Sequence, residues 1–184
     1  SVDIPDVAYL VLHDLNESVN VIGSDQPRLE VRSISGNLLQ KLNYNISGDT
    51  LTLSQLHAEG VKTVKITVFV PRSGLKGMTI DRGAAIVKGL EQERLYLSQN
   101  AGRISMSDNK ILKIQIVASR RSYLDVSATE LDTLSANIEE SQIVVSSPVK
   151  LLKGSMKNNS FLHVTDSDEI QFKKDETSRL YLYQ

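Results

Sequence analysis

The fold of this chain is decided by residues 102–126, which read GRISMSDNKILKIQIVASRRSYLDV. At both ends of this stretch, a small residue is followed two and four places later by apolar residues: Gly102, Ile104 and Met106, then Ser122, Leu124 and Val126. Between them, Ile114 and Ile116 flank a glutamine. Because alternation with a period of two is typical of β-strands, the stretch predicts a succession of short strands separated by turns.

The same pattern of small and apolar residues recurs through the last two thirds of the chain. Its central apolar residues are Ile86, Ile104, Leu124, Ile143, Leu162 and Leu180, which are 18, 20, 19, 19 and 18 residues apart. Two or three short strands in about 19 residues match one coil of a β-solenoid, in which each coil hydrogen-bonds to the next and buries apolar side chains against it. We therefore predict an all-β fold, a single-stranded right-handed parallel β-helix with a small residue at a tight corner of each coil.

Residues 1–74 show alternating runs at less regular spacing. They predict strands at residues 7–12, 18–22, 29–34, 42–46, 50–53 and 64–70, the last of which is closed by Pro71. Gly48 and Asp49 lie between two of these strands and are typical of a hairpin turn, so part of this region is expected to be antiparallel. We expect one β-helix domain over residues 1–184, with irregular strands in residues 1–74 and six regular coils in residues 75–184.

A leucine-rich repeat is the main alternative fold. Residues 75–80, 111–116 and 131–136 approximate its L-x-x-L-x-L strand pattern. That repeat usually has about 20–29 residues and an inward asparagine or cysteine soon after the strand. At the five corresponding positions this chain has asparagine only at Asn100 and Asn159, so the spacing favours the β-helix. The best helix candidate, residues 128–140, lies within the repeat and is interrupted by serine and threonine, and we predict strand and turn there.

Composition excludes several classes of function. The 184 residues include 21 basic and 22 acidic side chains, so no overall field attracts a polyanion and we expect no nucleic-acid partner. The chain has no cysteine, which excludes disulfides, thiolate nucleophiles and sulfur-ligated zinc. The three histidines, His13, His57 and His163, lie far apart without ligand spacing, so we predict no metal, no cofactor and no catalytic residue. No apolar run is long enough for a transmembrane helix.

Residues between the buried positions should point outward, because side chains alternate faces along a strand. One outward column is predicted to be Ala85, Arg103, Tyr123, Gln142, Phe161 and Arg179, and its neighbour Val87, Ser105, Asp125, Val144, His163 and Tyr181. The opposite register would bury Arg103, Asp125 and Arg179 together, which is energetically unfavourable.

This outward surface is the predicted ligand site. Its candidate residues are Tyr123, Phe161, His163, Tyr181, Arg103, Arg179 and Asp125. Exposed aromatic rings among polar groups can stack on and hydrogen-bond an extended glycan or peptide. The alternative is that aromatic and β-branched residues are here only because they favour strands.

Three other features of the sequence are candidate sites. Arg120 and Arg121 could hold a carboxylate or sulfate, or form a solvated turn between coils. The aspartates at 81, 108, 125, 132, 166 and 168 fall at different places in the coil, so they should not form the calcium-binding cluster of a polysaccharide lyase. The last coil ends at residues 180–183 without a capping helix, and this open edge is expected to mediate homo-oligomerisation or partner docking.

Four features occur in a telling order along the chain. They are Val19-x-Val21 followed by residues 23–25 (GSD), the turn at residues 48–49, the VFVP strand ending at Pro71, and the pattern L-x-x-M-x-I-x-x-x-A-x-I at residues 75–86. In this order, over most of the chain, they resemble the putative auto-transporter adhesin, head GIN domain family of Bacteroidetes. The later coils depart from it in having fewer Gly-Ser-Gly turns.

The resemblance implies a right-handed β-helix that Bacteroides-like bacteria export to the periplasm or the outer cell surface. Such chains often derive from a lipoprotein-type precursor, and we expect the leader or anchor to be absent from this one. The family offers no catalytic residue. We therefore expect a non-catalytic, exported binding or adhesion module whose ligand is a glycan or a host or matrix protein. A purely structural or self-assembling solenoid is the alternative, followed by a polysaccharide-cleaving enzyme.

Overall fold

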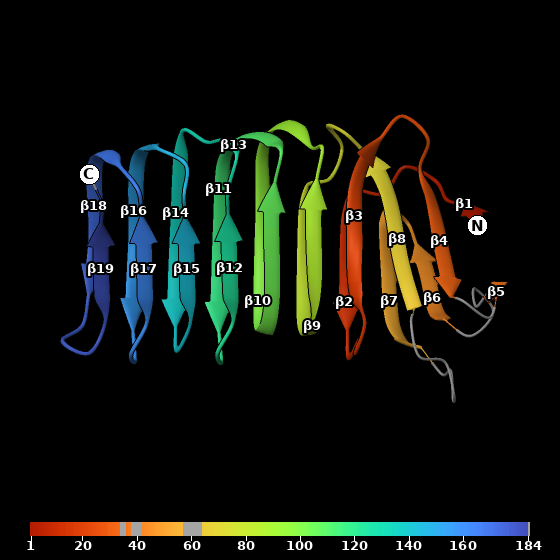
Figure 1. The fold of residues 1–184 in the computed structure, drawn as a ribbon, viewed down its shortest axis with the longest axis horizontal. Helices are drawn as coiled ribbons and strands as arrows, with labels where there is room; N and C mark the ends of the chain where they lie inside the picture. The colour runs from red at the N-terminus through yellow and green to blue at the C-terminus, as the bar shows by residue number, and fades with distance from the viewer. Residues whose placement is uncertain (34–35, 38–41, 57–63, 184) are drawn as a thin grey trace.

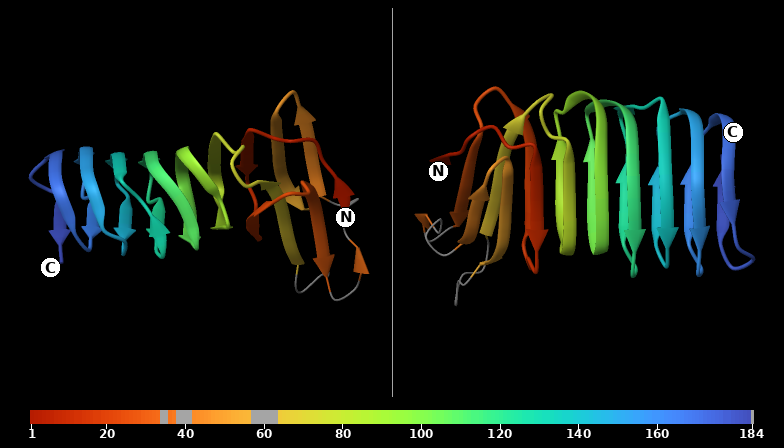
Figure 2. Two further views of the ribbon diagram at one scale, coloured as in Figure 1. Left: turned by 90° about the horizontal axis from the view of Figure 1, so that it is seen from above. Right: turned by 180° about the vertical axis from the view of Figure 1, so that it is seen from behind.

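The computed structural model describes residues 1–33, 36–37, 42–56 and 64–183 (Figure 1). These residues form strands and turns, and none of them forms a helix long and apolar enough to cross a membrane. The predicted all-β parallel solenoid is confirmed, with about six turns. The coils stack along the long axis of the molecule, so that the last strands lie at the far end from the N-terminus (Figures 1 and 2).

Each coil contributes strands to two parallel sheets. The first sheet contains β2 (Tyr9–His13), the first halves of β9 (Gly77–Lys88) and β10 (Glu91–Ser107), β11 (Asn109–Ser119), β14 (Thr133–Glu139), β16 (Val149–Lys157) and β18 (Ser167–Lys174). The second contains β3 (Ser18–Ser24), the second halves of β9 and β10, β12 (Tyr123–Val126), β15 (Gln142–Val145), β17 (Phe161–Val164) and β19 (Arg179–Leu182). β13 (Thr129–Glu130) pairs with the start of β11. Apolar residues of both sheets share one buried core.

The corner between the two sheets is built from small buried residues, as the sequence predicted. Ser122, Ser141, Ser160 and Ser178 stack there, and each coil hydrogen-bonds to the next through them. The backbone N–H of Ser122 donates to Oγ of Ser141 at 3.1 Å, and that of Ser160 donates to Oγ of Ser178 at 3.2 Å. The residue before Ser122, Ser141 and Ser160 has a positive φ, which is 63° at Arg121, 47° at Glu140 and 56° at Asn159. We call this stack the serine ladder.

The N-terminal region combines antiparallel and parallel pairing. β6 (Leu42–Ser47) and β7 (Thr50–Leu56) form the predicted hairpin, and β4 (Arg28–Ser33) pairs antiparallel with β8 (Val64–Pro71), with β1 (Val2–Asp3) and with β5 (Gly36–Asn37). All six predicted strands are present, although Ile34 lies outside the described residues. The region also forms regular coils: β2 lies between β7 and β9, and β3 between β8 and β9. The coils are therefore not stacked in sequence order.

The predicted register was wrong in the first regular coil. Ala85 and Val87 are buried, whereas Ile86 is 36% exposed. Ala84 pairs with Arg103 and Ile86 with Ser105, so the outward columns begin with Ala84 and Ile86. The side chain that decides this register is Lys88, two residues after Ile86. Burying Ile86 would also turn Lys88 toward the core, whereas the observed register leaves Lys88 exposed.

Candidate functional site

The seven predicted ligand residues lie on the outer face of the second sheet, from β10 to β19. Tyr123, Phe161 and Arg179 belong to one row, which also includes Arg103 and Gln142. Asp125, His163 and Tyr181 belong to the neighbouring row. With neighbouring strands about 4.8 Å apart, four strand intervals make a surface about 19 Å long. We call it the aromatic ladder.

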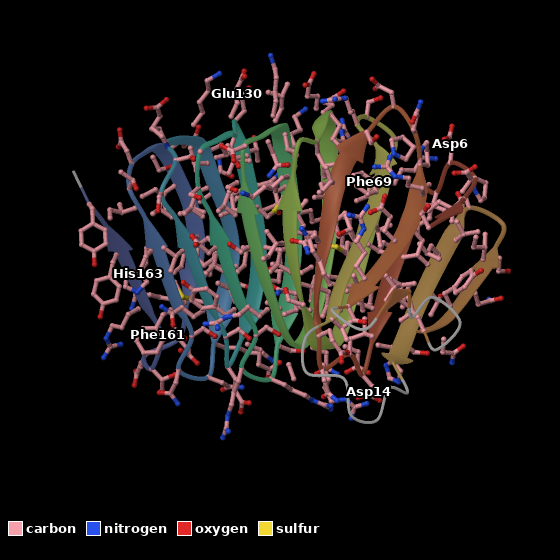
Figure 3. All side chains as sticks on the ribbon, turned by 45° about the vertical axis from the view of Figure 1, so that its right-hand side comes forward. Asp6, Asp14, Phe69, Glu130, Phe161 and His163 are labelled. Carbon is pink, nitrogen blue, oxygen red and sulfur yellow. The ribbon has the colours of Figure 1, made fainter. Side chains whose placement is uncertain are left out.

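The C-terminal end of the aromatic ladder holds a stack of three rings. The rings of His163 and Tyr181 are 4.7 Å apart between centroids, with an interplanar angle of 22°. Tyr183 extends the stack, with its centroid 6.1 Å from that of His163 and its hydroxyl 3.4 Å from His163 Nδ1. Figure 3 shows His163 and Phe161 projecting outward at this end of the molecule. Tyr183 was missed in the sequence analysis, although its place two residues after Tyr181 puts it on the same face.

At the other end of the aromatic ladder, an arginine packs on an aromatic ring. The Arg103 guanidinium lies 4.8 Å from the centroid of Tyr123, a cation–π contact. Tyr123 and Phe161 lie on either side of Gln142 and line a shallow hollow of about 290 Å³. Arg179, next to Phe161, is held by hydrogen bonds from its Nη1 to the carbonyl oxygens of Glu176 and Ser178. The surface thus offers flat rings, one shallow hollow and cations, but no deep pocket among the described residues.

The paired arginines singled out in the sequence lie beside the aromatic ladder. Arg120 and Arg121 are exposed, and both have positive φ at the corner between sheets, which fits the solvated turn. Arg121 also lines the shallow hollow between Tyr123 and Phe161. His57 lies outside the described residues. In the part of the chain that the structure describes, no three histidine or acidic side chains gather as a metal site.

His13 lies against two acidic side chains, in contacts that the sequence did not predict. Its Nδ1 lies 2.9 Å from an oxygen of Asp81 and its Nε2 3.1 Å from an oxygen of Asp14. Arg82 pairs with Asp14 at 2.6 Å, and the amide of Asn100 donates to Asp81 at 3.0 Å. This polar cluster links β2 to β9 and β10. The sequence did not reveal it because the pairing of β2 with β9 was not predicted.

A second surface feature lies on the outer face of the first sheet and was also missed. It is a groove of about 760 Å³, lined by Lys76, Arg94, Leu95, Tyr96, Lys113, Ile114, Gln115, Thr133, Ser135, Leu151 and Lys153. Four of these residues are cationic and none is acidic. We call it the cationic groove.

Comparisons with known proteins place the fold. No family model and no curated protein matches the sequence. The structure is similar to that of a putative adhesin from Bacteroides fragilis, with a TM-score of 0.69 and 10% identity over 98% of this chain and 94% of that one. A putative adhesin from Parabacteroides distasonis has a TM-score of 0.64 and 14% identity over 99% of this chain and 91% of that one.

A third solved structure, a putative lipid binding protein from Parabacteroides distasonis, has a TM-score of 0.56 and 14% identity over 100% of this chain and 95% of that one. At such low identity, these similarities establish a shared fold and nothing finer.

Proposed function

We propose that the chain is a non-catalytic, exported binding or adhesion module that holds an extended glycan or a surface protein on its aromatic ladder. The observation that carries the proposal is the stack of the His163, Tyr181 and Tyr183 rings on the outer face of the sheet, with Phe161 on the same strand as His163. The solved structures of this fold that are named adhesins, from Bacteroides and Parabacteroides, support an exported role of this kind.

The shape of the aromatic ladder favours a polymeric ligand. A small molecule is usually bound in a concave pocket that covers most of its surface. Here the rings and polar groups are spread over about 19 Å of nearly flat sheet. Tyrosine and histidine combine a ring face, which can stack on a sugar or a peptide side chain, with a polar atom that can hydrogen-bond to it. Arg103 and Arg179 add cationic donors at separate points along the surface.

The alternative is a structural or self-assembling solenoid, in which the aromatic rings only cover exposed sheet. The two hypotheses predict different effects of removing the rings. A binding module loses its ligand while the fold is kept, because the rings lie on the outer face of the sheet and not in the buried core. A structural element has no ligand to lose.

The test is binding of the purified chain to an array of glycans and extracellular-matrix proteins. We expect at least one ligand whose binding is lost in the variant Tyr123→Ala, Phe161→Ala and is retained in Tyr44→Ala. Tyr44 is a matched control because it is also an exposed aromatic residue, but it lies on β6, outside the aromatic ladder. Unchanged binding in the double variant, or no ligand at high protein concentration, would contradict the proposal.

A further inference from the structure

The cationic groove crosses five consecutive coils of the first sheet. Lys76 precedes β9, Arg94 lies on β10, Lys113 on β11, and Lys153 on β16, while Thr133 lies on the intervening β14. At about 4.8 Å per coil, the four intervals give a length of about 19 Å. The groove and the aromatic ladder belong to different sheets, so one surface can be altered without touching the other.

The charges in the groove are less balanced than those at several other positions of the same sheet. Three lysines outside the groove are each paired with an acid of the adjacent coil: Lys110 with Glu130, Lys150 with Asp132, and Lys157 with Glu139. In the groove, two cations face each other across neighbouring strands, because Arg94 pairs with Lys113 in the register. Like charges directly opposite each other destabilise a sheet. An anion in the groove would relieve this repulsion.

One internal anion already offsets part of the repulsion. Glu93 lies beside the groove and contacts both Arg94, at 3.2 Å, and Lys113, at 3.4 Å. Hydrogen bonds from these two side chains hold the pKa of Glu93 below its ordinary value, so the carboxylate is ionised at neutral pH. No carboxylate of the described residues pairs with Lys76 or Lys153. The groove therefore keeps a net positive charge, although the whole chain has a formal net charge of −1.

The other lining residues indicate the kind of anion. Gln115, Thr133 and Ser135 lie between the cations and offer neutral donors and acceptors suited to hydroxyl groups. Tyr96 is 41% exposed and can stack on one sugar ring. A single aromatic residue is too few for the successive base stacking of single-stranded nucleic acid. Of the three aliphatic lining residues, Leu95 and Ile114 are buried and only Leu151 is partly exposed, which is a small apolar surface for insertion into a membrane.

We propose that the cationic groove binds a linear acidic polysaccharide, whose sulfate or carboxylate groups contact Lys76, Arg94, Lys113 and Lys153. This site does not depend on the aromatic ladder. It gives the solenoid a second binding surface with different ligand chemistry.

The experiment measures the affinity of the whole chain for heparin, a sulfated glycan, and for polygalacturonate, a carboxylated one, with neutral dextran as the negative probe. We expect the variant Lys113→Gln, Lys153→Gln to bind the acidic glycans about tenfold or more weakly. We expect Glu93→Gln to bind them more tightly, because it removes the competing anion. Binding should also weaken as salt is added.

The control variant is Lys65→Gln, Lys174→Gln. It removes the same two charges from exposed positions on β8 and β18, outside the groove, and we expect little change in affinity. Equal losses in the two double variants would mean diffuse attraction and would overturn the proposal. It would also be overturned if neither acidic glycan binds at low salt. The proposal would also be overturned if the groove bound an oligonucleotide or phosphatidylglycerol vesicles more tightly than either acidic glycan. The gain expected from Glu93→Gln keeps the test decisive even if the lysine variants fold poorly.

Discussion

Replacing Ser141 by alanine should destabilise the protein more than the loss of one oxygen atom suggests. Ser141 is 4% exposed and occupies the middle of the serine ladder. Its Oγ accepts a hydrogen bond from the backbone N–H of Ser122 at 3.1 Å and donates one to the carbonyl oxygen of Glu139 at 2.8 Å. Ser141→Ala removes both contacts and leaves the buried N–H of Ser122 without this acceptor.

The size of the effect follows from these two losses. A net hydrogen bond is worth about 0.5–1.5 kcal/mol, and a buried donor without a partner costs about 1–3 kcal/mol. Because the two losses overlap in part, we expect the free energy of unfolding to fall by about 2–3 kcal/mol. For a chain of this size, each kcal/mol corresponds to roughly 2–4 °C in Tm, so the midpoint should fall by about 4–12 °C.

Urea unfolding followed by circular dichroism measures this effect, and an unchanged m-value shows that the same surface is exposed. The matched control is Ser146→Ala, since Ser146 is exposed and its side chain makes no hydrogen bond to the described residues. It should unfold like the wild type. A change in Ser141→Ala within about 0.5 kcal/mol of the wild type, the range of ordinary surface substitutions, would refute the assigned role of the serine ladder.

Three further predictions concern other parts of the solenoid. Gly154→Ala should be strongly destabilising, because Gly154 has a φ of 133° and an added Cβ would overlap the carbonyl of Ala136. Gly48 also has a positive φ, of 58°, but has open space around it, so Gly48→Ala should lower the free energy of unfolding by only about 1 kcal/mol in the same urea assay. The backbone N–H of Asn158, aided by the hydroxyls and N–H groups of Thr177 and Ser178, lowers the pKa of Asp175 to about 2. A carboxyl group whose pKa is lower in the folded state stabilises the fold at pH values above its unfolded pKa of about 3.9, and this stabilisation is lost as the pH falls to the folded pKa. The last coil should therefore lose protection from hydrogen exchange between about pH 4 and pH 2, and Asp175→Asn should abolish this pH dependence. Among the described residues, β18 and β19 each pair with a neighbouring strand on one side only, and Leu182 is exposed. We therefore expect light scattering to show a concentration-dependent dimer that Leu182→Asp disrupts. A strict monomer at high concentration would contradict this prediction.

The period of the solenoid could be predicted because every regular coil must bury the same few positions. The order of stacking could not, because an apolar strand shows the same alternation whichever neighbour it packs against. The coil of β2 and β3 would look the same in sequence if it lay at the end of the stack, yet it lies between β7–β8 and β9. For the same reason, the sequence did not predict the contact of His13 with Asp81, which depends on the pairing of β2 with β9.

The cationic groove, by contrast, left a signal in the sequence. Lys76, Arg94 and Lys113 are 18 and 19 residues apart, close to the period of the buried positions. Spacing close to the coil period places residues near one another on successive coils. The signal was missed because charge was judged over the whole chain, where 21 basic and 22 acidic residues nearly cancel. In a solenoid, charge has to be counted along each row of the coils.

Because a repeat in the sequence becomes a row of side chains on the surface, the fold favours one kind of ligand. A residue type that recurs about every 19 residues becomes a line of side chains about 4.8 Å apart, and one coil contributes only one or two contacts to it. No single contact on such a line is strong, but a polymer that lies along it makes several at once and gains affinity from their sum. A small ligand could reach only one or two of them. Both exposed surfaces therefore favour chains over small molecules, the aromatic ladder through ring stacking and the cationic groove through charge.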